Sequence, residues 1–158
     1  MRRLKNLIIL LTILPWLSVP FLGGKTLKKF TPGVLFITLY VTVEGWLAEK
    51  KKWWWFFHKA KPNVLGELPL IVGPFIVGSF WTLKFTYGNL KRYFITNLII
   101  DSFFTYILVG IFKRMGYASL VRLSKFKLSL LFLIKAFSMY GFQYSYDLYK
   151  TKSKKEDM

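Results

Sequence analysis

The chain has 158 residues, of which 54% are apolar and 20% aromatic, and its mean hydropathy is +0.38. This is more apolar material than a small soluble core can bury, and it comes in blocks rather than with the period of an amphipathic helix. The composition therefore excludes an ordinary soluble domain. It predicts an all-α, multi-pass transmembrane helical bundle with about five spans, each of about 20 residues.

The charge is strongly unbalanced, with 24 Lys and Arg against 7 Asp and Glu and a net charge of +17. In a soluble protein this would indicate nucleic-acid binding, but here the basic clusters flank apolar blocks, where cations meet lipid phosphates. We therefore expect the lipid bilayer as partner and no nucleic acid. The chain has no cysteine, which excludes disulfides, thiol catalysis and thiolate metal sites. The basic clusters lie at 2–5, 25–29, 50–52, 113–114 and 150–155.

The first apolar block, 7–24, has no charged residue and is just long enough to cross a bilayer. Pro15 and Pro20 should kink it. A cleaved signal peptide is the alternative, which would leave four spans, but the small-residue cleavage pattern is missing. We expect the first helix to be retained.

The second block, 31–48, is predicted to begin at Pro32, because proline is favoured in the first helical turn. Segment 49–63 follows with a lysine run and five consecutive aromatic residues, 53–57. This pattern suits the headgroup zone. His58 is the only histidine, and we interpret it as an interfacial residue.

The third block, 64–87, contains Pro69, Gly73, Pro74 and Gly78. We expect a bent or locally unwound helix, because prolines remove backbone donors and neighbouring helices must satisfy the freed groups.

The fourth and fifth blocks are predicted at 93–112 and 128–146, and they complete a single transmembrane domain over 1–149. The polar segment 150–158 is expected to be disordered. A slight excess of basic residues in the segments that share a side with the N-terminus favours a cytoplasmic N-terminus.

Five ionisable residues fall within or beside the blocks, and each costs roughly 2.5–3.5 kcal/mol in mid-helix unless it finds a partner. In antiparallel helices Asp101 and Lys135 would differ in depth by about 4.5 Å, which a lysine can bridge. An ion pair involving Asp101 is the first hypothesis, with Lys84 as second partner. The alternatives are lysines that snorkel beside a neutral Asp101, and a transport or catalytic carboxylate. The five residues are Glu44, Glu67, Lys84, Asp101 and Lys135.

Asn97, Asp101 and Thr105 recur at a spacing of four and should form one polar stripe on the fourth helix. The stripe is interpreted first as interhelical glue, and alternatively as a polar cavity closed by Asp101 and Glu44. Glu44 and Glu67 could share a proton or a cation, or pair with the nearby lysines.

We find no catalytic, cofactor-binding or metal-binding residues. The sequence lacks an acidic cluster for metal-dependent phosphoalcohol transfer, a histidine pair for zinc and a Gly-x-Ser-x-Gly nucleophile turn. We therefore expect no enzymatic activity and no cofactor.

Part of the third and fourth blocks resembles small multi-pass membrane proteins of spore-forming Gram-positive bacteria, which have no assigned function. The resemblance implies a bacterial cell-membrane protein and carries over no catalytic residue. It rests on Gly73-Pro74-Phe75, Gly78, Trp81, Lys84, Thr86-Tyr87-Gly88-Asn89, Lys91-Arg92-Tyr93, Asn97 and Asp101.

Three functions are left open by the sequence. The leading hypothesis is a non-enzymatic membrane component that packs with partner proteins or with itself. The alternative is a small transporter or permeation subunit with a polar site around Asp101, suggested by the broken third helix beside the polar stripe. A lipid-active enzyme is the third hypothesis.

Overall fold

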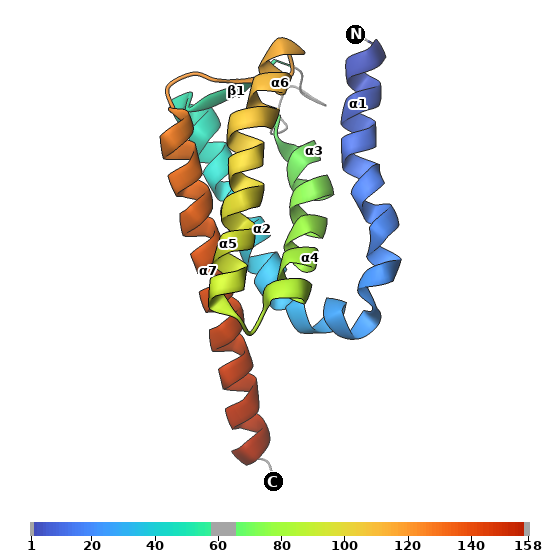
Figure 1. Ribbon diagram of the computed structural model, residues 1–158, viewed down its shortest axis with the longest axis vertical. Helices are drawn as coiled ribbons and strands as arrows, with labels where there is room; N and C mark the ends of the chain where they lie inside the picture. Colours follow the sequence, from blue (N-terminus) through green and yellow to red (C-terminus); the bar gives the residue numbers. More distant parts are fainter. Residues whose placement is uncertain (1, 58–65, 157–158) are drawn as a thin grey trace.

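A computed structural model describes residues 2–57 and 66–156, which form a bundle of five long helical rods (Figure 1). His58 lies outside the described residues. The bounds are α1 Arg2–Ile13 with the 3-10 helix η1 Leu14–Leu22; α2 Gly24–Lys51; α3 Leu68–Leu70, the π-helix η2 Ile71–Phe75 and α4 Ile76–Thr86; α5 Leu90–Ser102, the π-helix η3 Phe103–Leu108 and α6 Val109–Arg114; and α7 Lys125–Glu156.

The predicted all-α bundle is confirmed, and four of its rods are long and apolar enough to cross a membrane. They cover Lys5–Leu22, Gly24–Lys51, Leu68–Thr86 and Leu90–Arg114. The fifth rod, α7, packs beside α2 and α5 along its apolar half. The N-terminus and the C-terminus lie at opposite ends of the bundle (Figure 1).

The helix breaks lie near the positions that the prolines predict. The first rod changes from α to 3-10 geometry where Pro15 stands in the first turn of η1. The third rod contains a π-helical turn that includes Gly73 and Pro74. A second π-turn, η3, interrupts the fourth rod without a proline and was not predicted.

Pro32 does not start the second helix, which begins at Gly24 and runs through it. The prediction was wrong because a side chain from α7 supports the backbone there. Gln143 is fully buried, and its amide nitrogen donates to the carbonyl of Lys29 at 3.0 Å while its oxygen accepts from the Gly33 N–H at 3.1 Å. Gly33 has no side chain to obstruct this approach, since a Cβ there would lie 2.6 Å from the Gln143 oxygen.

The tail is also helical, contrary to the expected disorder of 150–158, because α7 continues to Glu156. No proline or glycine follows Gly141, and lysine and glutamate have good helix propensity. Lys154 and Lys155 in the last turn also complement the negative end of the helix dipole.

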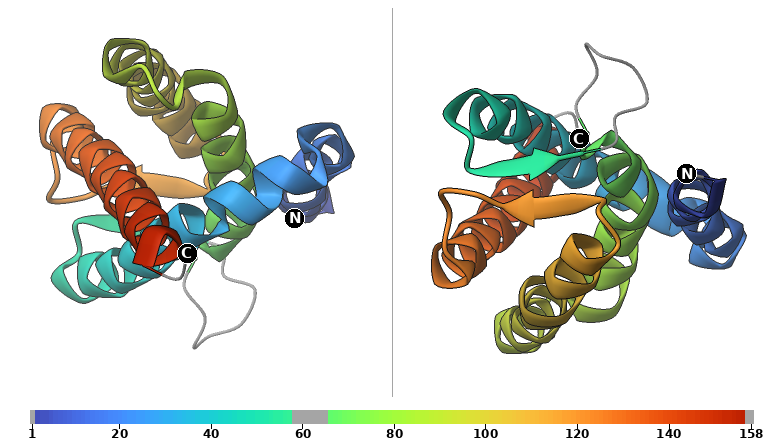
Figure 2. Two further views of the ribbon diagram at one scale, coloured as in Figure 1. Left: turned by 90° about the horizontal axis from the view of Figure 1, so that it is seen from below. Right: turned by 90° about the horizontal axis from the view of Figure 1, so that it is seen from above.

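A small antiparallel sheet covers the end of the bundle nearest the N-terminus (Figure 2, right). It pairs β1, Trp54–Phe56, with β2, Ala118–Leu120. The predicted headgroup aromatics therefore form a strand, in which Trp54 and Phe56 are buried and Trp55 is exposed. This is the alternation expected of a strand with one face on a core.

The first rod packs at the side of the bundle (Figure 2) and is held mainly by the third rod. Gly73 permits this contact, because a Cβ there would clash with the carbonyl oxygen of Leu11. Two indoles add hydrogen bonds of 2.9 Å, from Trp16 to the Val72 carbonyl and from Trp81 to the Ser18 hydroxyl.

Candidate functional site

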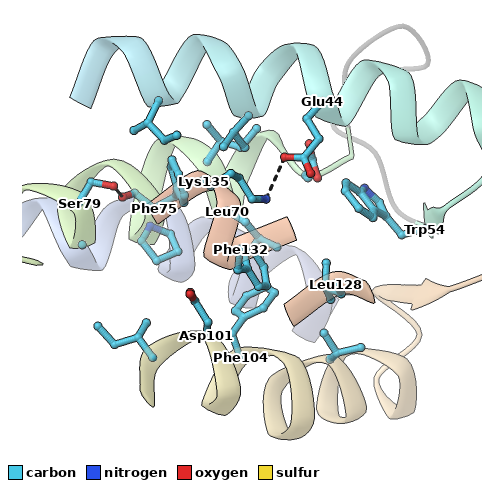
Figure 3. A pocket seen from close by; sticks show the side chains of 18 of the residues that line it. Glu44, Trp54, Leu70, Phe75, Ser79, Asp101, Phe104, Leu128, Phe132 and Lys135 are labelled. Carbon is cyan, nitrogen blue, oxygen red and sulfur yellow. Dashed lines mark hydrogen bonds and ion pairs between the residues drawn. The ribbon is translucent and has the colours of Figure 1, made fainter. Parts of the chain in front are cut away.

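The other four rods and the sheet enclose a cavity of about 260 Å³ (Figure 3). Most of its wall is apolar, and α1 contributes no residue to it. Polar and charged side chains also line it, and they come from α2, β1, the start of the third rod, α4, α5, β2 and α7. They are Glu44, Trp54, Glu67, Ser79, Thr82, Asn97, Asp101, Ser119 and Lys135.

Lys135 forms an ion pair with Glu44 inside this cavity. Its Nζ lies 2.9 Å from Oε2 of Glu44, and the two side chains are only 7% and 9% exposed. The same Nζ stands 4.3 Å from the ring centre of Phe132, close enough for a cation–π contact. The lysine therefore does not snorkel; a carboxylate and an aromatic face hold it within the bundle.

The predicted Asp101–Lys135 ion pair is not formed. The helix α7 packs against both α2 and α5, and Lys135 forms its ion pair with Glu44 of α2. Asp101 nevertheless points into the same cavity from α5 (Figure 3). The prediction compared depths along two helices only and did not include the third helix that borders α7.

Glu67 reaches the cavity from the residue before the third candidate span, and it is 8% exposed. Its carboxyl lies against Gly45 of α2, where any Cβ would clash. Oε1 of Glu67 and the indole nitrogen of Trp54 are both buried and make no well-formed hydrogen bond in the described part of the chain, although the indole lies close enough to the Glu67 carboxyl to act on it. Burial raises the pKa of Glu67 to about 7; Lys135 opposes this shift and the Glu44 carboxylate adds to it.

The predicted stripe on the fourth rod is only partly realised. Asn97 and Asp101 line the cavity, and the Asn97 amide donates to the Tyr93 carbonyl at 2.8 Å. Thr105 is fully buried but does not line the cavity, and its hydroxyl has no hydrogen-bond partner among the described residues. It lies in the π-turn η3, where the spacing of four no longer keeps residues on one face.

Lys84 is not a partner of Asp101. Its Nζ donates to the carbonyl of Phe21 at 2.9 Å and stands 5.0 Å from the ring centre of Trp81. It thus ties the end of the first rod to α4. Among the described residues Glu44 pairs with Lys135 of α7 and not with a loop lysine, and Lys59 and Lys61 lie outside the described residues.

Sequence reasoning missed four polar cavity residues: Trp54, Ser79, Thr82 and Ser119. Ser79 and Thr82 are buried and stand three residues apart, a spacing that places them on one helix face and could have been noticed. Trp54 could not have been found without knowing that β1 turns alternate aromatic residues inward.

Among the described lining residues, three carboxyl groups share the cavity with one ammonium group. Among the described residues, no cluster of three or more His, Asp or Glu is arranged to hold a metal ion. The arrangement combines apolar walls with a few converging polar groups, which is typical of a small-molecule site.

Comparison with known proteins adds no family or fold relationship. No protein-family model matches the chain, and no curated protein or solved structure shows significant similarity to it.

Proposed function

We propose that this protein is a non-enzymatic membrane protein that conducts or carries a small solute through the polar cavity in its bundle. The observation that carries this proposal is the meeting of Asp101, Asn97 and Glu44 at one cavity of about 260 Å³. Sparse polar groups acting only as interhelical glue would bond to each other and leave no such space.

Two further features support a transport role over partner packing. Buried polar atoms without well-formed hydrogen bonds cost free energy, so a site that leaves Glu67 Oε1 in this state favours a ligand or water there. The broken third rod also borders the cavity at Pro74, as discontinuous helices do in transporters.

In this proposal α7 is a fifth span, and the membrane is a bacterial cell membrane. The apolar part of α7 runs antiparallel to α5 beside it (Figure 1), and the two chain ends lie on opposite sides of the bundle. Lys135, the charged residue in this part of the helix, is neutralised by Glu44, which lowers the cost of burying it in the membrane.

Cysteine labelling tests whether solutes reach the cavity, and the natural chain offers a cysteine-free background. Ser79→Cys and Thr82→Cys place thiols in the cavity wall. We expect both to react with a small, membrane-impermeant methanethiosulfonate reagent in native membranes.

Thr86→Cys is the matched control, because Thr86 is buried one turn further along α4 and does not line the cavity. It should stay unreactive until detergent or denaturant opens the bundle. If the three cysteines were equally unreactive in membranes, the cavity would be closed to solutes and the proposed function would be wrong.

A further inference from the structure

We infer that the solute of this cavity is an organic ammonium ion with an apolar body. The inference rests on the proposed transport function and names the class of compound that the site would take. Four observations about the described residues lead to it, and they concern charge, unbonded atoms, aromatic walls and size.

The charge balance selects against anions. Lys135 is paired with Glu44 at 2.9 Å, so Glu67 and Asp101 face the cavity without an ion pair among the described residues and share only the more distant charge of Lys135. An anionic solute would have to enter beside these two carboxyl groups, whereas a cation would be attracted to them.

The unbonded atom also points to a cation. Oε1 of Glu67 is buried, belongs to a residue that is 8% exposed, and makes no well-formed hydrogen bond in the described structure, although the Trp54 indole lies close enough to act on the same carboxyl. An ammonium group supplies N–H donors and a positive charge together, and charge-assisted hydrogen bonds of this kind are the stronger ones.

Lys135 already shows how the site holds an ammonium group. Its Nζ has a carboxylate on one side and the Phe132 ring on the other, at 4.3 Å from the ring centre. The opposite wall repeats these elements, with Asp101 close to the aromatic ring of Phe104 (Figure 3). A second ammonium group would therefore meet the same combination of carboxylate and aromatic face.

The volume and the apolar lining of the cavity determine what the rest of the solute can be. A cavity of about 260 Å³ exceeds the roughly 150 Å³ of an apolar protein cavity that binds benzene. A single aromatic ring with a short aminoalkyl chain would fit it, and the apolar lining would bury that ring.

Three probes of nearly equal size separate charge from shape: 2-phenylethylamine, 2-phenylethanol and phenylacetate. We expect calorimetric titration of the full chain in detergent at pH 8 to show the amine binding about tenfold or more tightly than the alcohol. Phenylacetate should bind more weakly than either. Equal affinities for amine and alcohol, or a preference for phenylacetate, would overturn the inference.

Variants locate the bound cation. Asp101→Asn and Glu67→Gln should each weaken amine binding about tenfold and leave the affinity for the alcohol nearly unchanged. Asp147→Asn is the matched control, because Asp147 is an acid of α7 outside the cavity, and it should leave amine affinity unchanged. Unchanged amine affinity in both folded cavity variants would overturn the inference.

The two proposals fail in different ways. If the Ser79→Cys thiol reacts but the amine has no advantage over the alcohol, the cavity admits solutes and only the ammonium assignment is wrong. If that thiol is unreactive and none of the three probes binds, the proposed function itself is wrong.

Discussion

At the scale of single residues, the ion pair between Glu44 and Lys135 is the most consequential contact in the bundle. Both side chains are more than nine-tenths buried, so each charge depends on the other for compensation. Removing one member of a buried pair costs about 3–5 kcal/mol in soluble proteins, because the remaining charge is left unpaired. An unpaired lysine in a membrane protein costs less free energy if its ammonium group can reach the lipid headgroups.

We expect Glu44→Gln to lower the melting temperature of the purified protein, and Lys135→Met added to it to restore much of the loss. Asp101→Asn should be milder, because Lys135 keeps its partner. A double-mutant cycle read by thermal melting measures both couplings. Stronger coupling of Lys135 to Asp101 than to Glu44 would contradict the pairing described above.

Glu67 makes stability depend on pH, because burial raises the pKa of its carboxyl from 4.5 to about 7. Between these values the folded chain binds the proton that the unfolded chain releases, so the free energy of unfolding falls as pH rises. The charge of Lys135 lowers the pKa of this carboxyl, and the charges of Glu44 and Glu49 raise it. Tyr117 also lies close enough to interact with the carboxyl.

The wild-type protein should therefore lose stability relative to Glu67→Gln as pH rises from 5 to 8. Melting curves of both proteins across this range measure the difference. Parallel pH profiles would show that Glu67 titrates normally in the folded chain.

At the scale of elements, Gln143 explains how a helix runs through Pro32. A proline in a helix interior removes one backbone hydrogen bond and costs about 3 kcal/mol. Here a buried amide from α7 bonds to the Lys29 carbonyl and the Gly33 N–H, so α2 and α7 are joined where the proline weakens the helix.

Gln143→Leu should lower the melting temperature, because it leaves the buried Gly33 N–H unpaired, at about 1–3 kcal/mol, and removes the donor to the partly buried Lys29 carbonyl. Ser138→Ala on the same helix is the control, since Ser138 is only half-buried and its hydroxyl donates to the Ile134 carbonyl within its own helix. Equal melting temperatures for the two variants would mean that the Gln143 bridge does not stabilise the fold.

The packing of the first rod against the third rod depends on the close approach of their backbones at Gly73. Gly73→Leu should displace α1 from the third rod, because even a Cβ at this position would clash with backbone atoms of Leu11 and Thr12. We expect a protease-accessible first rod with an intact ion pair, seen as limited proteolysis near 13–24 without a large loss of the main melting transition. Gly78→Leu is the control, because a Cβ there has open space.

At the scale of the whole molecule, apolar blocks and basic flanks were enough to predict the all-α bundle. Pro69, Gly73 and Pro74 also marked the break in the third rod. These features are local, because hydropathy and proline act within one or two helical turns.

What the sequence could not provide depends on contacts between distant segments. Lys135 pairs with Glu44 and not with Asp101 because of the way three helices pack. Pro32 is tolerated within a helix because Gln143, more than 100 positions away, bonds to the backbone beside it. Trp54 faces inward only because β1 pairs with β2. The cavity lies between such segments, so its residues were predicted only in part.

The five-span arrangement predicts that the two chain ends lie on opposite sides of the membrane. Reporter fusions after Gly24, Asn63, Asn89, Ser124 and Met158 should alternate in their signals, with the N-terminal side cytoplasmic. Identical signals at Ser124 and Met158 would show that α7 does not cross the bilayer.

The most direct test of the central claim is flux through the cavity of the reconstituted protein. Labelled phenyltrimethylammonium keeps the charge and the aromatic ring of the proposed solute but not its N–H donors, and its permanent charge keeps it from crossing a bare bilayer. We predict that its uptake into proteoliposomes exceeds that into protein-free vesicles and that Asp101→Asn lowers it severalfold, while Asp147→Asn does not. Uptake equal to that of protein-free vesicles, with protein shown to be folded and inserted, would contradict a permeation pathway through this cavity.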